Sequence, residues 1–259
     1  MFRDPVNETT VVPDMPYQQL DPDKIVETVQ ILHRRMKERF PQVGLVAVCE
    51  KLLEISRLAR ERSNAIARPI PWVRALSALV IVSILALFAW ALISAQPSGE
   101  RHTLEEIVQV TEPGMNVIVA LGVTVLFFVT LETRIKRGRA LKAIHELRAI
   151  AHNIDMHQLT KDPERLLNQG NQRKDTQSSP KRTMTEFELS RYLDYCSEML
   201  SLTGKIAALY VQGFEDSVAV GAVNDIESLT TAMARKIWQK LMVLHTVHVE
   251  RAPQEVERV

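Results

Sequence analysis

The chain has 259 residues, and its 32 Lys and Arg against 31 Asp and Glu give a formal net charge of +1. This balance argues against a dedicated nucleic-acid-binding protein, which normally carries a basic excess, and two cysteines exclude a disulfide scaffold. Nine glycines and twelve prolines are too few for a collagen-like or low-complexity chain. These averages conceal two long stretches without charge, which decide the class of the protein.

The chain before the first of these stretches predicts an arm followed by two helices. Residues 1–20 carry three prolines and no periodicity, which is typical of an irregular arm. Asp21 followed by Pro22 is a strong helix start. Apolar residues then recur at steps of three and four, which predicts a cytoplasmic helical pair over 21–68 with a break at Pro41.

Residues 75–95 contain 21 positions without a charge, a glycine or a proline. About 20 residues at a rise of 1.5 Å cross the ~30 Å hydrocarbon core of a bilayer. We therefore predict a first transmembrane helix over 72–96. The competing interpretation, a buried helix of a soluble bundle, is weaker because such helices rarely stay uncharged over this length.

A second uncharged stretch, 113–131, predicts another transmembrane helix over 113–133, with an outer loop over 97–112 between the two. This stretch is less apolar than the first. We interpret its small and polar residues as helix-packing positions or, in an oligomer, as pore-lining groups. These residues are Asn116, Gly122, Thr124 and Thr130.

The charges flanking the two stretches predict the orientation in the membrane. The loop 97–112 carries four acidic residues and one arginine, whereas basic residues flank the hairpin on its other side. By the positive-inside rule both termini are cytoplasmic, and the first span serves as an uncleaved signal anchor. The expected basic cluster at the membrane interface consists of Arg68, Arg74, Arg134, Lys136, Arg137 and Arg139.

The remainder of the chain predicts further cytoplasmic helices. The second span continues as a helix over 134–158, a flexible linker covers 159–184, a helical pair covers 185–248, and 249–259 form a tail. No stretch alternates like a strand, so we predict an all-α membrane protein with a two-helix transmembrane hairpin and a cytoplasmic helical bundle. The seams of this bundle could lie within one chain or join subunits as a coiled coil. Cys49 and Cys196 lie in apolar stripes and are interpreted as buried structural thiols.

A polar stripe on the predicted helix 134–158 is the main candidate for chemistry. His145, His152, Asp155 and His157 could bind a divalent transition metal, but the histidine spacings of seven and five differ from the usual i, i+4 pair, so another helix or subunit would have to contribute ligands. The alternatives are a polar network and a solvated face. No nucleotide-binding, hydrolase, metalloprotease or EF-hand motif occurs, so we expect no enzyme and no cofactor.

Residues 146–164 (ELRAIAHNIDMHQLTKDPE) and 191–210 (RYLDYCSEMLSLTGKIAALY) are similar to segments of bacterial two-span membrane proteins whose activity is uncharacterised. The resemblance implies a bacterial inner membrane and transfers no site residue. We expect a non-enzymatic two-pass inner-membrane scaffold that contacts the lipid bilayer, self-associates as a homo-oligomer through its cytoplasmic helices, and binds an unknown cytoplasmic protein but no nucleic acid. An oligomeric pore or membrane-perturbing effector and a metal-binding or metal-sensing bundle are the alternatives.

Overall fold

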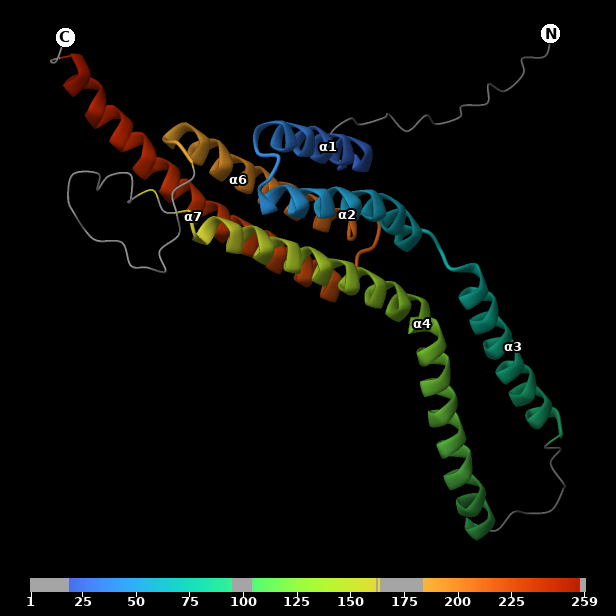
Figure 1. The fold of residues 1–259 in the computed structure, drawn as a ribbon. Coiled ribbons are helices and arrows are strands. Elements are labelled where there is room, and N and C mark those ends of the chain that lie inside the picture. Colours follow the sequence, from blue (N-terminus) through green and yellow to red (C-terminus); the bar gives the residue numbers. More distant parts are fainter. Residues whose placement is uncertain (1–18, 95–103, 162, 164–183, 257–259) are drawn as a thin grey trace, which may run out of the picture.

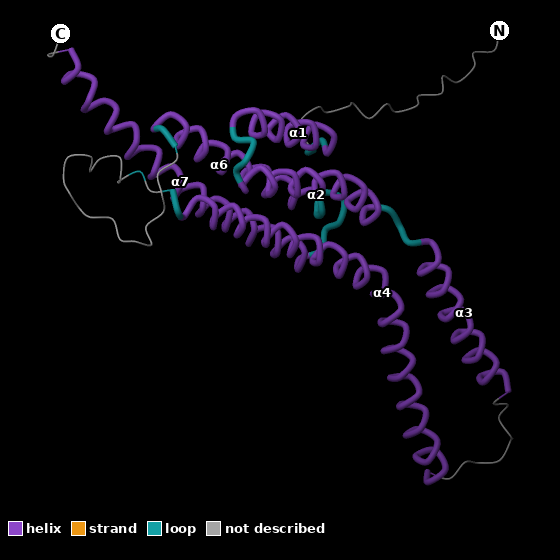
Figure 2. The backbone as a smooth tube through the Cα atoms, viewed as in Figure 1, coloured by secondary structure: helices purple, strands orange, loops and turns teal. Residues whose placement is uncertain are grey.

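The computed structural model describes residues 19–94, 104–161, 163 and 184–256. Within these ranges every regular element is an α-helix, which confirms the predicted all-α class (Figures 1 and 2). Most of the predicted arm, linker and final residues (1–18, 164–183 and 257–259) lie outside the described residues. The helices in chain order are α1 Pro22–Arg39, α2 Gly44–Ala67, α3 Pro71–Ser94, α4 Leu104–Leu159, α6 Glu186–Leu209 and α7 Ser217–Val256.

Two helix boundaries differ from the expected ones. The helix α4 begins at Leu104 and includes residues that the sequence analysis assigned to the outer loop, so Pro113 lies inside a helix. The helix α7 continues to Val256, into the predicted tail. Both extensions contain an interior proline, Pro113 in α4 and Pro253 in α7, although such a residue removes a backbone hydrogen bond and crowds the preceding turn.

The described helices form a bundle and two arms (Figure 1). The bundle consists of α1, α2, α6, α7 and the second half of α4. The arms, α3 and the first half of α4, extend away from it together, and α4 changes direction where it leaves the bundle (Figures 1 and 2).

Local signals start the bundle helices as the sequence predicts. The carboxylate of Asp21 accepts hydrogen bonds from the backbone N–H groups of Asp23 (2.9 Å) and Lys24 (3.4 Å), which caps α1. At the start of α6, the Thr185 hydroxyl accepts a bond from the Glu188 N–H (3.2 Å), and the Glu188 carboxylate accepts one from the Thr185 N–H (2.8 Å). This is a complete capping box, which satisfies two backbone donors that the helix itself leaves unpaired.

The helix α6 lies at the centre of the bundle and contacts α1, α2, α4 and α7. Its buried residues include Tyr192, Tyr195 and Met199, and the apolar stripes of α1 and α2 close over them. These helices therefore pack against one another within one chain. Cys49 and Cys196 are both buried, and burial raises the pKa of each thiol to about 12. The structure thus confirms their interpretation as structural residues.

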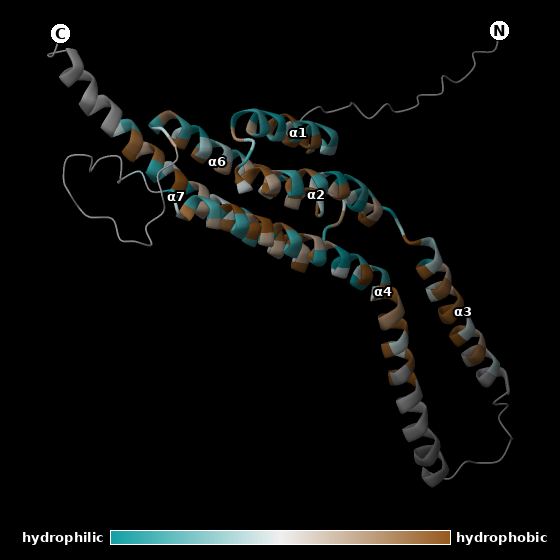
Figure 3. Ribbon diagram, in the orientation of Figure 1, coloured by the Kyte–Doolittle hydropathy of each residue, from teal (hydrophilic) through white to brown (hydrophobic). Residues whose placement is uncertain are grey.

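The arms show the opposite pattern of exposure. Apolar side chains of α3 such as Leu79 and Leu87 are about two-thirds exposed, as are Val123 and Leu126 of α4. Figure 3 shows that hydrophobic residues cover much of α3 and of the adjoining part of α4, outside the bundle. One stretch of the described residues, Gly44–Leu87, contains a segment long and apolar enough to cross a membrane, and only 11% of that segment is buried. This exposure distinguishes it from the core helix of a soluble protein.

Candidate functional site at the junction of bundle and arms

A single carboxylate joins the two arms where they meet the bundle. Glu132 of α4 receives Arg74 Nε at 2.7 Å and Lys136 Nζ at 2.9 Å, and the Ile70 backbone N–H donates to it at 3.3 Å. The Glu132 side chain is 15% exposed and that of Lys136 is 10% exposed, whereas that of Arg74 is 64% exposed. Because Arg74 and Ile70 lie at the start of α3, these bonds hold the first turn of α3 against α4.

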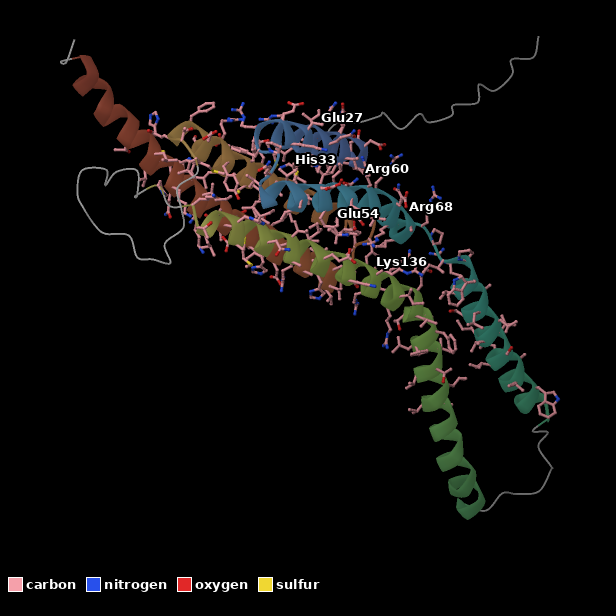
Figure 4. The ribbon with its side chains drawn as sticks, in the orientation of Figure 1. Glu27, His33, Glu54, Arg60, Arg68 and Lys136 are labelled. Atoms are coloured by element: carbon pink, nitrogen blue, oxygen red, sulfur yellow. The ribbon has the colours of Figure 1, made fainter. Side chains whose placement is uncertain are left out.

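One turn further along the arms, the Ser77 hydroxyl of α3 donates to the Phe128 carbonyl of α4 at 3.1 Å. Figure 4 shows Lys136 beside the point where α4 leaves the bundle and Arg68 at the end of α2 that leads into α3. The sequence analysis did not identify Glu132 as a site residue. The sequence does contain a sign of this ion pair, since Glu132 is an acidic residue four positions before Lys136 and at the edge of an uncharged stretch.

A second carboxylate, that of Asp216, links α4 to the start of α7. Arg137 donates to both oxygens of Asp216, from Nε at 3.0 Å and from Nη2 at 2.7 Å. Asp216 is 4% exposed in its side chain and also accepts a bond from the Ala219 N–H at 3.0 Å, at the start of α7. The hydrogen bonds from Arg137 hold the pKa of the Asp216 carboxyl below its usual range, although burial acts in the opposite direction.

The six residues predicted as one basic cluster therefore have different environments. Arg74 and Lys136 bond Glu132, Arg137 bonds Asp216, and the Arg134 guanidinium lies 5.5 Å from the centre of the Phe127 ring. Arg68 and Arg139 are exposed. Two carboxylates of the same chain thus pair with three of the six cations, which leaves a net charge of about +4 on the cluster and its partners.

The four candidate metal ligands are not gathered in the structure. His145 and His152 are exposed, whereas Asp155 accepts a hydrogen bond from Gln158 Nε2 at 2.7 Å. His157 lies against the start of α2, where a Cβ on Gly44 would be 2.8 Å from its Cε1. No three His, Cys, Asp or Glu residues in the described part of the chain are arranged to hold a metal. Spacings of seven and five residues separate the histidines by about 10.5 and 7.5 Å along the helix, which is too far for one ion.

Among the four polar and small residues of the second predicted span, Thr130 bonds within its own helix and Gly122 is exposed. The Thr130 hydroxyl donates to the Leu126 and Phe127 carbonyls of its own helix, at 2.9 and 3.1 Å. Gly122 is exposed, and a Cβ there would meet nothing within 4 Å, so it is not a close-packing point within this chain. Thr124 is half-buried, and the side chain of Asn116 lies outside the described residues. Gly122 would therefore be a close-packing point only against a second copy.

The end of the bundle away from the arms presents an aromatic surface. A groove of about 700 Å³ lies between the start of α6 and the second half of α7. We call it the distal groove. Its largest apolar residues are Phe187 (62% exposed), Trp238 (60% exposed) and Met242 (43% exposed). Aromatic residues and methionine are the types that protein interfaces favour over ordinary surface.

No protein-family model, no curated protein and no solved structure matches this chain. The residues that perform its function must therefore be identified from its own sequence and structure.

Proposed function

We propose that the protein is a two-pass scaffold of a bacterial inner membrane. In this proposal α3 and the first half of α4 cross the bilayer, and the helical bundle lies in the cytoplasm with both termini. The single observation that carries the proposal is the contrast in apolar exposure. The bundle buries most of its leucines and isoleucines, whereas several of those on the arms are 58–65% exposed: Leu79, Leu85, Leu87, Ile118 and Leu126.

The junction described above supports this role. Glu132 binds Arg74 and Lys136 at the edge of the uncharged stretches, where an ion pair can still reach the headgroup region. Arg137 then holds the bundle to α4 through Asp216. A force or a displacement at the membrane end would reach the bundle through these two carboxylates, as expected of a rigid anchor for a cytoplasmic platform.

Cysteine labelling in intact cells tests the topology. Ser98→Cys lies in the predicted outer loop, and Asn153→Cys lies on the exposed face of the bundle part of α4. The two native thiols are buried and should not react with the maleimide. We expect a membrane-impermeant maleimide to label Ser98→Cys in intact spheroplasts and Asn153→Cys only after lysis. Labelling of Asn153→Cys before lysis, or recovery of the protein in the soluble fraction, would refute the proposal.

We further propose that the scaffold self-associates through the distal groove. The core of each bundle is already closed, so its buried stripes are not available for a second copy. The helix α7 extends past the other helices of the bundle (Figure 1), and Trp238 and Met242 are left uncovered on it. Large aromatic anchors of this kind supply most of the binding energy in protein interfaces.

The mass of the full-length protein in mild detergent tests this surface. We expect wild-type protein to be a dimer or larger and Trp238→Ala to be shifted towards monomer. Val218→Ala serves as the control, because Val218 is an exposed apolar residue on the same helix but outside the groove. A wild-type monomer at all concentrations, or equal dissociation of both variants, would contradict self-association through the groove.

A further inference from the structure

A small basic cavity lies between α2 and α4 on the bundle side of the junction. It has a volume of about 320 Å³, and six residues line it: Arg62, Ala65, Ile66, Arg139, Lys142 and Ala143. Three of them are cationic and three are apolar, and none is acidic. We call this the α2–α4 cavity.

Within the described residues, an acidic partner is recorded for only one of the three cations of this cavity. Arg62 Nη1 contacts Glu146 Oε2 at 2.8 Å, which neutralises one of the three cations and also fixes the guanidinium in place. Arg139 and Lys142 are exposed and stand three residues apart on one face of α4, where like charges repel. An anion in the cavity would relieve this repulsion and could accept bonds from the remaining guanidinium N–H groups.

The position of the cavity matches that of lipid headgroups, provided that the proposed membrane topology is correct. Arg139 lies eight residues after Leu131, the last residue of the uncharged stretch, which is about 12 Å along the helix. Ile66 lies five residues before Pro71, where α3 begins. Arginine and lysine side chains at such positions extend towards the interface while their stems cover apolar surface. A phosphate on the inner leaflet is therefore within reach of both helices.

The lining also favours an amphiphile over a simple ion. Ile66 is 2% exposed, and Ala143 is equally buried, so the floor of the cavity is apolar while its rim is cationic. An anionic phospholipid presents a phosphate beside a glycerol backbone and acyl chains, and basic pockets between helices on the cytoplasmic side are suited to such headgroups.

We infer that the α2–α4 cavity binds the phosphate of an anionic phospholipid of the inner leaflet. Arg62 and Arg139 supply planar donors to the phosphate oxygens, and Lys142 supplies a point charge. Ala65, Ile66 and Ala143 contact the glycerol region. The bound lipid would link α2 to α4 next to the junction and so stabilise the angle between bundle and arms.

Lipid binding to full-length protein in a nonionic detergent tests the inference. The probes are phosphatidylglycerol, phosphatidylcholine as the neutral lipid, and inorganic phosphate. We expect saturable binding of phosphatidylglycerol, at least tenfold weaker binding of phosphatidylcholine, and no competition from phosphate at millimolar concentration. Equal binding of both lipids would overturn the inference. Displacement of phosphatidylglycerol by phosphate would show a soluble ligand and overturn the assignment to lipid.

A matched pair of double variants separates the cavity from general surface charge. Arg139→Gln with Lys142→Gln removes both exposed cations of the cavity. Arg34→Gln with Lys37→Gln removes an exposed arginine and lysine with the same spacing from α1. We expect the first variant to lose at least tenfold in affinity for phosphatidylglycerol and the second to stay within twofold of wild type. Equal losses would refute a specific cavity.

Flotation with neutral vesicles distinguishes a failure of the lipid-site inference from a failure of the proposed membrane scaffold. Wild-type protein and both double variants should insert and float, because the arms are unchanged. A protein that does not float contradicts the membrane scaffold itself. A protein that floats but shows no difference between the double variants contradicts only the lipid site.

Discussion

Gly213, in the turn between α6 and α7, provides a sharp test of how the bundle is packed. A Cβ at this position would lie 2.7 Å from the Ala67 Cβ, at the end of α2, and 3.6 Å from the Ala67 Cα. Carbon atoms attract best at about 3.5–4.0 Å, so the first contact overlaps by about 1 Å. Neither atom can move by a rotamer change, so the turn and the end of α2 would have to separate.

We expect Gly213→Ala to lower the free energy of unfolding by about 1–2 kcal/mol. Overpacking of a close contact typically destabilises the folded state by about 1–3 kcal/mol. Alanine also lowers the conformational entropy of the unfolded chain, which offsets about 0.4–1 kcal/mol of this loss. For a domain of this size the loss corresponds to a fall in Tm of about 2–8 °C. Urea unfolding of the full-length protein in mild detergent, followed by helical circular dichroism, measures it.

A double-mutant cycle tests whether the clash with Ala67 causes the loss of stability in Gly213→Ala. Ala67→Gly removes the clashing atom, which leaves the ordinary contact at 3.6 Å, so the double variant should be more stable than the sum of the two single changes by about 1–2 kcal/mol. Gly138→Ala is the control, because a Cβ there meets nothing within 4 Å and alanine favours a helix by about 0.5–1 kcal/mol. Additive effects of Ala67→Gly and Gly213→Ala would refute the packing argument.

Three further predictions follow from buried groups of the bundle. The lowered pKa of Asp216 contributes stability above the usual aspartate pKa of about 4, and this stability is lost as the pH falls through the lower folded value. Urea midpoints between pH 7 and pH 3 should therefore fall less steeply for Asp216→Asn than for wild type; parallel curves would contradict this. Cys49 and Cys196, with pKa values raised to about 12, should resist a thiol reagent at pH 8 until urea unfolds the bundle. Rapid labelling of the native protein would show that the core is open. Leu193→Ala should cost about 2–5 kcal/mol in urea unfolding, because Leu193 is fully buried in α6; a loss below 1 kcal/mol would mean that this core is loosely packed.

The helices were predictable from the sequence because their signals are local. Asp21 caps α1 through the next two or three residues, and Thr185 with Glu188 forms a box within one turn. The apolar stripe of α1 and the uncharged stretch of α3 are likewise patterns of near neighbours, which fix helix type and a buried or exposed face before any tertiary contact forms. The buried cysteines were predictable for the same reason.

The ion pairs between distant helices were decided only by the tertiary structure. Asp216 meets Arg137 from 79 residues away, and Glu132 meets Arg74 from 58. The His157 ring lies against Gly44 at the start of α2, whereas His145 and His152 are exposed. A pattern of residues shows that cations gather next to the uncharged stretches, but the packing of distant helices selects which of them bind carboxylates. The α2–α4 cavity and the junction at Glu132 thus result from helix packing, whereas the helices that form them result from local sequence.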